Sequence, residues 1–243
     1  MNLKTKDVFL YGKHAVELAI KNPQRQIKEI YITKDTAAQI TIPSHIVVHV
    51  TDRKCLETLV GRDAVHQGIV AKCAPLPQLT LKELLESIKN KEHALIIILD
   101  QVSDPHNIGA ILRSAVAFHA SAVIVPEAGV PDESGTLAKS ASGALDLIPL
   151  IRVSNLVRAI QDLKKADFWC IGMDGYAKDV FGATKLPKKC VLIMGSEGTG
   201  MRRLTEENCD LLMKLPMNPI IESLNVSNAA TIAMYEWART NNN

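Results

Sequence analysis

Runs of apolar residues recur at short intervals along the chain, and they predict strands that alternate with helices. Residues 94–99 (ALIIIL) are apolar at every position, which is typical of a strand buried on both faces of a parallel sheet. Further apolar runs predict five more strands, at 122–126, 147–153, 168–174, 190–195 and 211–217. Helical periodicity predicts helices at 81–90, 107–120, 134–145, 155–166 and 224–240. This order favours an α/β fold with a mostly parallel sheet covered by helices on both faces.

The first third of the chain predicts a separate, smaller α/β unit. Helices are expected at 12–22 and 55–61, and strands at 27–33, 45–50 and 66–73. The stretch APLPQLT that follows has two prolines within four residues, which is typical of a linker. We therefore expect a small domain over residues 1–74, a linker over 75–90 and a larger domain over 91–243.

Composition narrows the class of protein. The chain has 243 residues and is 47% hydrophobic, which is enough to bury a sizeable core. The opening MNLKTKDVFLYGK is charged and lacks the apolar segment of a signal peptide, and ALIIIL is far shorter than the ~20 residues of a membrane span. The five cysteines include no C-x-x-C pair and are odd in number. We expect reduced thiols in a cytoplasmic protein.

Charge is spread unevenly along the chain. Residues 1–76 hold 11 Lys and Arg against 7 Asp and Glu, whereas the remainder holds 17 against 19. Four of the seven histidines also lie in the first third. This distribution is compatible with an ordinary solvated surface, but it also suggests a polyanionic partner that contacts the N-terminal third.

Ligands of parallel α/β sheets bind beyond the carboxyl ends of the strands, and the first loop of interest there follows residues 94–99. In DQVSDPHNIGAILRSA, Asn107 is placed to cap a helix, and Gly109 and Arg113 share one helical face. The apolar residues around Arg113 would leave little of this helix for water, so an idle arginine would be costly there. The alternative is a capped helix with one surface arginine.

The second loop is GSEGTGM, residues 195–201. Its glycine order, G-x-x-G-x-G, differs from the dinucleotide pattern G-x-G-x-x-G, which argues against a Rossmann-type oxidoreductase. It also lacks the Gly-Lys-Ser/Thr ending of a phosphate-binding P-loop. Three glycines around Glu197, directly after an apolar strand, are consistent with backbone wrapped around a ligand or with a tight turn alone.

The third loop is ESLNVS, residues 222–227, which opens the last predicted helix. One polar side chain suffices for a helix cap, yet Ser223, Asn225, Ser227 and Asn228 all lie here. The helix behind them is apolar on most faces, so we expect it to be buried in the core or against another subunit. No nucleophile elbow is present, and His106 and His119 lack metal-ligand spacing, so no metal is predicted.

The three loops, in this order, resemble the SpoU family of RNA ribose 2′-O-methyltransferases. The family motif N-x-G-x-x-x-R matches Asn107, Gly109 and Arg113. The motif G-x-E-G-x-G matches Gly195, Glu197, Gly198 and Gly200, and the motif S-L-N-x-S matches Ser223, Leu224, Asn225 and Ser227. YGKHAV (11–16) and HQGIVA (66–71) are similar to the small substrate-binding domain of those members that methylate a guanosine ribose in 23S ribosomal RNA.

The resemblance implies a C-terminal α/β-knot (SPOUT) domain, a small L30e-like RNA-binding domain, S-adenosylmethionine as cofactor and a homodimer that includes the last helix. It implies catalytic roles for Arg113, Asn107, Glu197, Ser223 and Asn225. It implies cofactor contacts from Gly195, Gly198, Leu215, Met217 and Leu224, and RNA contacts from Lys13, His14, His66 and Gln67. A transfer RNA substrate and a non-catalytic RNA-binding protein of this fold are the alternatives.

Arg113 and Pro219 each raise a chemical question within the family pattern. The family proposal makes the arginine of the first motif a base, but a guanidinium is essentially always protonated, so phosphate binding or stabilisation of a developing alkoxide suits Arg113 better. Pro219 stands where the family commonly has glycine, four residues before Ser223. Proline fixes φ and lacks an N–H, so the loop there is expected to differ in geometry.

Overall fold

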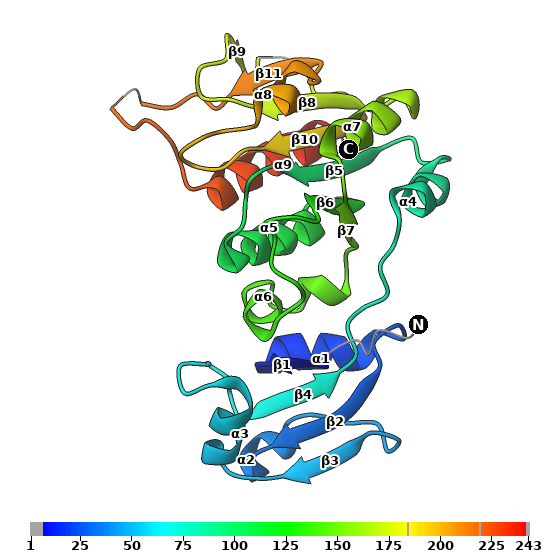
Figure 1. Ribbon diagram of the computed structural model, residues 1–243, viewed down its shortest axis with the longest axis vertical. Coiled ribbons are helices and arrows are strands. Elements are labelled where there is room, and N and C mark those ends of the chain that lie inside the picture. Colours follow the sequence, from blue (N-terminus) through cyan, green and yellow to red (C-terminus); the bar gives the residue numbers. More distant parts are fainter. Residues whose placement is uncertain (1–6, 184, 219, 242–243) are drawn as a thin grey trace. The chain divides into compact units, whose positions relative to one another are not determined.

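The computed structural model describes residues 7–183, 185–218 and 220–241, and the chain divides into two compact units (Figure 1). The first unit comprises Met1–Pro77 together with Pro131–Leu147, and the second comprises Gln78–Val130 and Ile148–Asn243. The sequence pattern gave no sign that residues 131–147 belong with the N-terminal third. Pro219 lies outside the described residues.

The first unit is built on a four-stranded sheet in the order β1-β4-β2-β3. β4 (Ile69–Cys73) is antiparallel to both β1 (Val8–Tyr11) and β2 (Ile27–Ile32), and β2 is parallel to β3 (Val47–Val50). The helices of its N-terminal part are α1 (Lys13–Lys21), α2 (Lys34–Ala37) and α3 (Arg53–Val60). From the inserted segment, α6 (Gly135–Ser140) packs against β1, and the 3₁₀ helix η1 (Ala144–Asp146) packs against α1.

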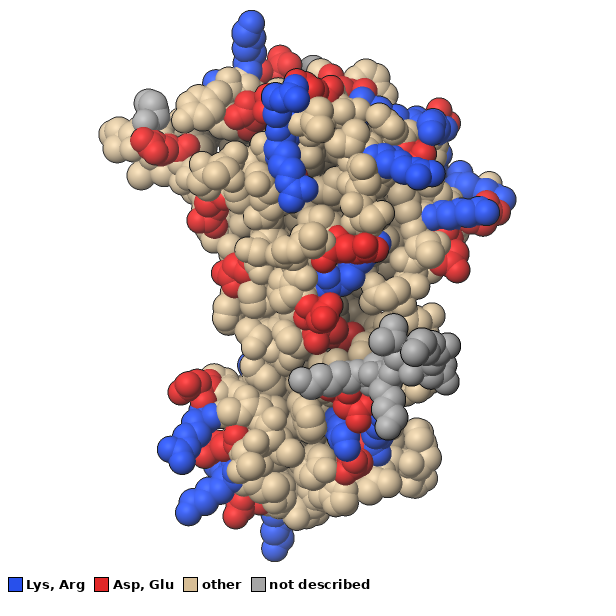
Figure 2. Space-filling model, in the orientation of Figure 1, with Lys and Arg blue, Asp and Glu red and all other residues tan. Residues whose placement is uncertain are grey.

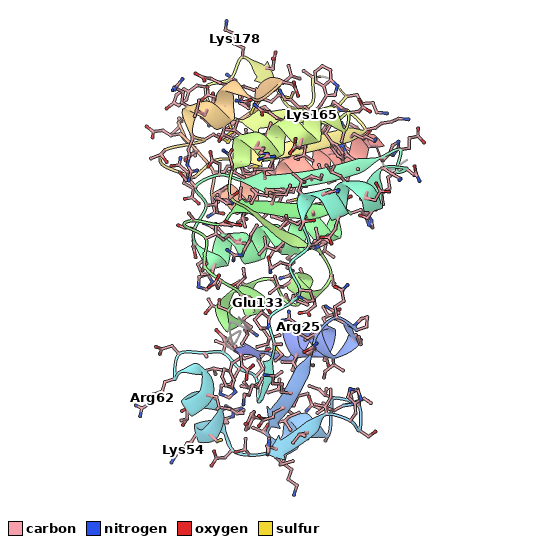
Figure 3. All side chains as sticks on the ribbon, turned by 45° about the vertical axis from the view of Figure 1, so that its right-hand side comes forward. Arg25, Lys54, Arg62, Glu133, Lys165 and Lys178 are labelled. Atoms are coloured by element: carbon pink, nitrogen blue, oxygen red, sulfur yellow. The ribbon has the colours of Figure 1, made fainter. Side chains whose placement is uncertain are left out.

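A buried ionic cluster holds the inserted segment to the first unit. The Arg25 side chain is 0% exposed; its Nε donates to Asp146 Oδ1 at 2.8 Å, its Nη2 donates to Asp146 Oδ2 at 3.1 Å, and it also pairs with Glu133 (Figure 3). Asn22 Nδ2 donates to the same Asp146 oxygen at 3.0 Å. Burial alone would lower the pKa of Arg25, but the two carboxylates outweigh it and raise that pKa. The guanidinium therefore stays charged and fixes this segment.

The second unit is built on a seven-stranded sheet in the order β7-β6-β5-β10-β8-β11-β9, in which every neighbouring pair is parallel. The strands are β5 (Ala94–Leu99), β6 (Ala122–Pro126), β7 (Leu150–Val153), β8 (Trp169–Met173), β9 (Asp179–Val180), β10 (Lys189–Met194) and β11 (Leu211–Lys214). All six residues of β5 are buried, as an all-apolar strand requires. The prediction of a mostly parallel sheet is confirmed.

The helices of this unit are α4 (Leu81–Ile88), α5 (Pro105–Ala117), α7 (Leu156–Lys165), α8 (Arg203–Glu207) and α9 (Val226–Asn241). Residues of α4 and α7 share one apolar core with alternate residues of β5 and β10, such as Ile96 and Val191. α5 and α9 pack against each other, and α9 also contacts β10 (Figure 1). None of the helices in the described ranges is long and apolar enough to cross a membrane.

The last helix returns to the middle of the unit after β11, which lies near the edge of the sheet. Trp237 is 2% exposed, and its Nε1 donates to the carbonyl of Pro187 at 2.9 Å. The expectation of a helix buried on most faces holds only in part, because Ile232 and Tyr235 are 43% and 53% exposed in the single chain.

Several expected boundaries differ from the structure. Asn107 is not the cap of α5, because Asp104 is the N-cap residue and its Oδ1 accepts from the His106 amide at 2.9 Å. Pro105 then occupies the first helical position, which favours this start. The helix expected over 134–145 is divided into α6 and η1 because Ser142 and Gly143 adopt positive φ angles. β1, α2, α8 and β9 were not predicted; they are only two to five residues long.

Candidate active site

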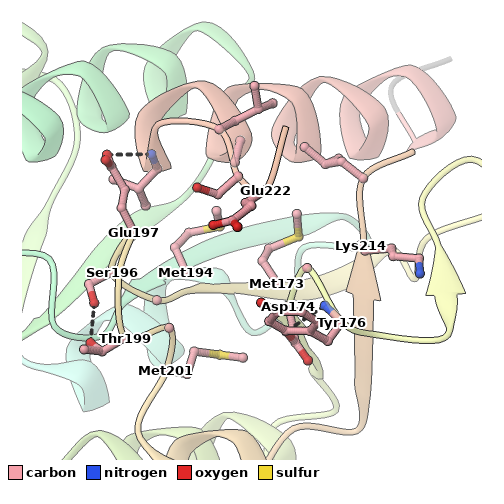
Figure 4. Close-up of a pocket in the computed structure, with 18 of the residues that line it drawn as sticks. Met173, Asp174, Tyr176, Met194, Ser196, Glu197, Thr199, Met201, Lys214 and Glu222 are labelled. Atoms are coloured by element: carbon pink, nitrogen blue, oxygen red, sulfur yellow. Dashed lines mark hydrogen bonds between the residues drawn. The ribbon is translucent and has the colours of Figure 1, made fainter. Parts of the chain in front are cut away.

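A cavity of about 590 Å³ lies at the carboxyl ends of β8, β10 and β11, where the chain enters α9 (Figure 4). Its lining includes all five residues proposed for the cofactor, namely Gly195, Gly198, Leu215, Met217 and Leu224. Glu197 and Ser223 also line it, whereas Asn107, Asn225 and Arg113 do not. A ligand site at this edge is what a parallel α/β sheet favours, and the volume is typical of a small-molecule pocket.

The loop over 195–201 is a closed turn. The amide of Ser196 donates to the carbonyl of Gly200, and the amide of Gly200 donates back to the carbonyl of Ser196, both at 3.0 Å. A Cβ at Gly195 would lie 2.2 Å from the carbonyl carbon of Gly200, and Gly200 itself has φ +65°. Gly195 and Gly200 are therefore required by the turn itself. Gly198 has open space where a side chain would stand.

The three motif loops meet at the start of α9. Asn225 Nδ2 donates to Glu197 Oε1 at 2.7 Å and to Asn107 Oδ1 at 3.0 Å. The amide of Val226 donates to the same Glu197 oxygen at 3.1 Å, and Asn225 Oδ1 accepts from the amide of Ser227 at 2.9 Å. Glu197 and Asn225 therefore cap α9 and also join the glycine loop to the segment that leads into this helix.

Arg113 lies apart from this junction. It is exposed on α5, so the expectation that its apolar neighbours exclude water from this position was wrong. Those neighbours lie on the buried side of the helix, and Arg113 lies on the solvent side. Within the described ranges its guanidinium forms no hydrogen bond or ion pair, and it is therefore available to a ligand or to another chain.

Two residues at the end of β5 were missed by the sequence reasoning. Asp100 is 0% exposed; its Oδ2 accepts from the amide of Arg202 at 2.8 Å, and its own amide donates to the carbonyl of Met194 at 2.8 Å. Gln101, with φ +62°, donates from Nε2 to the carbonyl of Gly200 at 3.2 Å. Together they fix the base of the 195–201 loop. The sequence did offer one indication of this role, because an aspartate follows the all-apolar strand directly.

The remaining lining combines thioethers with charged groups. Five of the seven methionines of the chain line the cavity, namely Met173, Met194, Met201, Met213 and Met217. Asp174, Lys214 and Glu222 contribute charges of both signs (Figure 4). Methionine adapts its shape and contacts aromatic rings favourably, so such a wall suits a ligand with an aromatic ring and a charged tail.

Comparison with known proteins identifies the family. Residues 94–235 match the model of the SpoU rRNA Methylase family, and residues 9–79 match the model of the RNA 2'-O ribose methyltransferase substrate-binding domain. The chain belongs to the SpoU rRNA methylase family. Among the similar sequences is the 23S rRNA (guanosine-2'-O-)-methyltransferase RlmB of Pseudomonas putida, which is 38% identical over 95% of this chain and 95% of that one. RlmB of Escherichia coli K12 is 37% identical over 95% of this chain and 97% of its own.

Solved SpoU structures share the fold. The SpoU methyltransferase AviRb of Streptomyces viridochromogenes superposes with a TM-score of 0.81 at 21% identity, over 96% of this chain and 89% of that one. A putative RNA methyltransferase of the TrmH family from Porphyromonas gingivalis gives a TM-score of 0.78 at 20% identity, over 98% and 91%. The expected fold class is confirmed: an α/β methyltransferase domain with a mostly parallel seven-stranded sheet, as in other SpoU and TrmH proteins, and a small N-terminal α/β domain.

The four candidate RNA contacts lie within the match to the SpoU substrate-binding domain. His66 is 8% exposed, and its Nδ1 accepts from the amide of Gly68 at 3.1 Å. It therefore stabilises the turn at residues 66–68 from the buried side. Gln67 is exposed on that turn, and its Oε1 accepts from the amide of Lys13 at 3.1 Å. His14 is exposed and lies 3.8 Å from Glu17. On the face shown in Figure 2, acidic and basic side chains are interspersed.

Metal ligands and thiols are the remaining candidate groups in this SpoU chain. No group of three His, Cys, Asp or Glu side chains within the described ranges is arranged to hold a metal ion. All five cysteines are free thiols. Burial raises the pKa of Cys73, Cys170 and Cys209 to about 12, so these three are unreactive at neutral pH.

Proposed function

We propose that the protein transfers a methyl group from S-adenosylmethionine to a ribose 2′-oxygen of RNA, and that the acceptor is a guanosine of 23S ribosomal RNA. The observation that carries the proposal is the junction of Glu197, Asn225 and Asn107 beside the cavity, since it unites the three SpoU motif loops in one place. The RlmB relatives, similar over nearly the whole chain, support the choice of acceptor.

The cavity fits this cofactor. Leu215, Met217 and Leu224 offer apolar contact for an adenine ring, and the backbone of the 195–201 loop offers polar groups beside it. Asp174 and Glu222 match the ammonium group of the methionine tail, and Lys214 matches its carboxylate. When bound, S-adenosylmethionine supplies a methyl group already activated by its sulfonium. The protein then has chiefly to align donor and acceptor and to exclude water.

We assign Arg113 to the RNA. Its guanidinium is exposed and unpaired within the described chain. A guanidinium is a cation with five N–H donors and no acceptor, so it suits a phosphate oxygen or a developing 2′-alkoxide rather than proton abstraction. Asn107 and Asn225 hold each other at the start of α9, and Ser223 lies on the exposed side of the cavity lining, where it can hydrogen-bond the ribose.

We further propose that the protein acts as a homodimer in the cytoplasm, where ribosomal RNA is found. Ile232 and Tyr235 of α9 are exposed in the single chain, and Tyr235 forms an edge contact with Phe118 just after α5. Exposed apolar and aromatic groups on packed helices are typical of a subunit interface. The N-terminal unit binds the RNA through Lys13, His14 and Gln67, and its free thiols suit a reducing compartment.

Methyl transfer from labelled S-adenosylmethionine tests the proposal, with unmodified 23S ribosomal RNA and unmodified transfer RNA as separate acceptors. We expect label in the ribosomal RNA and none in transfer RNA. Arg113→Lys keeps the charge but loses the planar fork, so its turnover should fall at least tenfold. Arg203→Lys, on an exposed arginine of α8, is the matched control and should transfer normally. Full turnover by Arg113→Lys would remove the specific role of Arg113, and absence of transfer to either RNA would remove the function.

A further inference from the structure

A cluster of two lysines and two glutamines lies in the first unit, where the start of α1, the turns near 39 and 67, and α6 come together. Lys139 Nζ donates to Gln67 Oε1 at 2.7 Å, and the amide of Lys13 donates to the same oxygen at 3.1 Å. Lys13 Nζ in turn donates to Gln39 Oε1. Lys139 comes from the inserted segment 131–147, which lies inside the match to the methylase model and outside the match to the substrate-binding model.

The two lysines have no counter-charge. Neither Lys139 nor Lys13 takes part in any ion pair that the described residues form, unlike Lys72, whose ammonium pairs with Glu29 at 2.9 Å. Lys139 is half-buried, and this burial lowers the pKa of its ammonium. One hydrogen bond to a neutral amide oxygen leaves two N–H donors of Lys139 available. A partly desolvated ammonium group without a counter-ion is energetically unfavourable, and a bound anion would compensate its charge.

The backbone is shaped around this cluster. Gln67 has φ +55° and Gly68 has φ +80°, and a Cβ at Gly68 would lie 2.3 Å from Thr36 Oγ1. A Cβ at Gly12 would lie 2.7 Å from Lys139 Nζ and 2.8 Å from its Cδ, so glycine there makes room for the lysine stem. Residues held in such uncommon conformations concentrate at functional sites.

The inserted segment has a fixed place in this unit. Arg25 binds Asp146 and Glu133 at its two ends, and Tyr11 Oη lies 3.4 Å from Thr136 Oγ1 between them. Lys139 is therefore held at a defined distance from Lys13 rather than projecting freely into solvent. Because Gln67 is exposed and Lys13 is half-exposed, the cluster is open to a long polymer as well as to a small ion.

We propose that Lys139 and Lys13, bridged by Gln67, bind a backbone phosphate of the RNA substrate. Lys139 is then an RNA-binding residue supplied by the connection between β6 and β7. This inference rests on the proposed function, because it takes the polyanion to be RNA. Each ammonium contributes a point charge to a phosphate oxygen, and the Gln67 amide group adds a neutral donor.

Binding of a fluorescent 23S ribosomal RNA fragment by the full chain, followed by anisotropy from about 50 to 200 mM KCl, tests the site. We expect Lys139→Gln to weaken binding about tenfold and to reduce the slope of log K against log salt by about one. Lys139→Arg keeps the charge and should bind within a few-fold of wild type. Lys54→Gln removes an exposed lysine on α3 (Figure 3) and should change neither affinity nor slope.

An unchanged affinity and slope in Lys139→Gln, with wild-type protein binding the RNA, would overturn the site and leave the proposed function intact. An equal loss in Lys54→Gln would also overturn it, since the effect would then reflect general charge. Failure of the wild-type chain to bind the RNA at all would remove the proposed function and this inference with it. A melting curve of Lys139→Gln that matches wild type shows that any loss arises from binding.

Discussion

Replacement of Glu197 by alanine tests the junction between the glycine loop and α9. One oxygen of Glu197 accepts both hydrogen bonds, from Asn225 Nδ2 at 2.7 Å and from the amide of Val226 at 3.1 Å. A hydrogen bond to a charged group contributes ~1.5–3 kcal/mol, and the exposure of Glu197 favours the lower end of that range. The two bonds together therefore contribute about 3 kcal/mol, and the charge at the helix N-terminus adds about 0.5 kcal/mol.

These values set an upper limit on the loss of cofactor affinity. If the loop is ordered only through this junction, Glu197→Ala weakens binding of S-adenosylmethionine by about two orders of magnitude, since 1.4 kcal/mol is a factor of ten. Glu197→Gln keeps an amide oxygen as acceptor and loses the charge, so about 1–1.5 kcal/mol, or roughly tenfold, is expected. Glu207→Ala breaks only a surface pair with Arg203 and should bind normally.

Isothermal titration of each variant with S-adenosylmethionine gives the affinities, and labelled-methyl transfer gives turnover. The expected order of affinity is wild type and Glu207→Ala, then Glu197→Gln, then Glu197→Ala. Wild-type affinity in Glu197→Ala with lost turnover would show that Glu197 acts in the chemistry and does not hold the loop. Wild-type affinity and turnover together would refute any role for the junction.

Three further predictions concern stability and reactivity. Arg25→Met leaves two buried carboxylates unpaired and should lower the free energy of unfolding by about 3–5 kcal/mol in urea titration. Arg53→Met, at an exposed site, should change this free energy little. Equal unfolding midpoints for the two variants would contradict the role of the buried ionic cluster. Hydrogen bonds from Tyr31 and Lys72 lower the pKa of Glu29 to about 2, so its stabilising contribution is present above pH ~4.3 and is lost as pH falls towards 2; an NMR titration midpoint above 4 would contradict this. A thiol reagent at about pH 8 should react slowly in the native protein with the three buried cysteines, Cys73, Cys170 and Cys190, and fully only after unfolding; immediate reaction of these three thiols would contradict their burial.

The parallel sheet was predictable because its central strands are apolar on both faces, and all six residues of ALIIIL are buried, as such a strand requires. The motif loops were predictable for a related reason, since polar residues that follow such strands gather at one edge of the sheet. The place of residues 131–147 was not predictable. It depends on Arg25, more than a hundred residues away, and on the carboxylates that this arginine finds in the folded chain.

Local sequence patterns gave the wrong or an incomplete prediction at three places in the site. Asn107 is a good cap by type, but Asp104 followed by Pro105 starts the helix earlier and leaves Asn107 free to bind Asn225. Apolar neighbours of Arg113 suggested burial, but helical periodicity places it on the opposite face. The glycines of 195–201 were compatible with a ligand site or with a tight turn, and the contact of Gly195 with the Gly200 backbone requires the turn while Gly195 also lines the cavity. In each case tertiary packing decided between interpretations that the sequence left open.

The most direct test of the central claim is the position of the transferred methyl group. Unmodified 23S ribosomal RNA is incubated with the protein and labelled S-adenosylmethionine and is then hydrolysed with alkali, which cleaves only next to a free 2′-hydroxyl. Our account predicts that the label appears in a single alkali-resistant dinucleotide that begins with guanosine, and that Arg113→Lys lowers its yield. Label in mononucleotides, which would mean methylation of a base, would contradict the account.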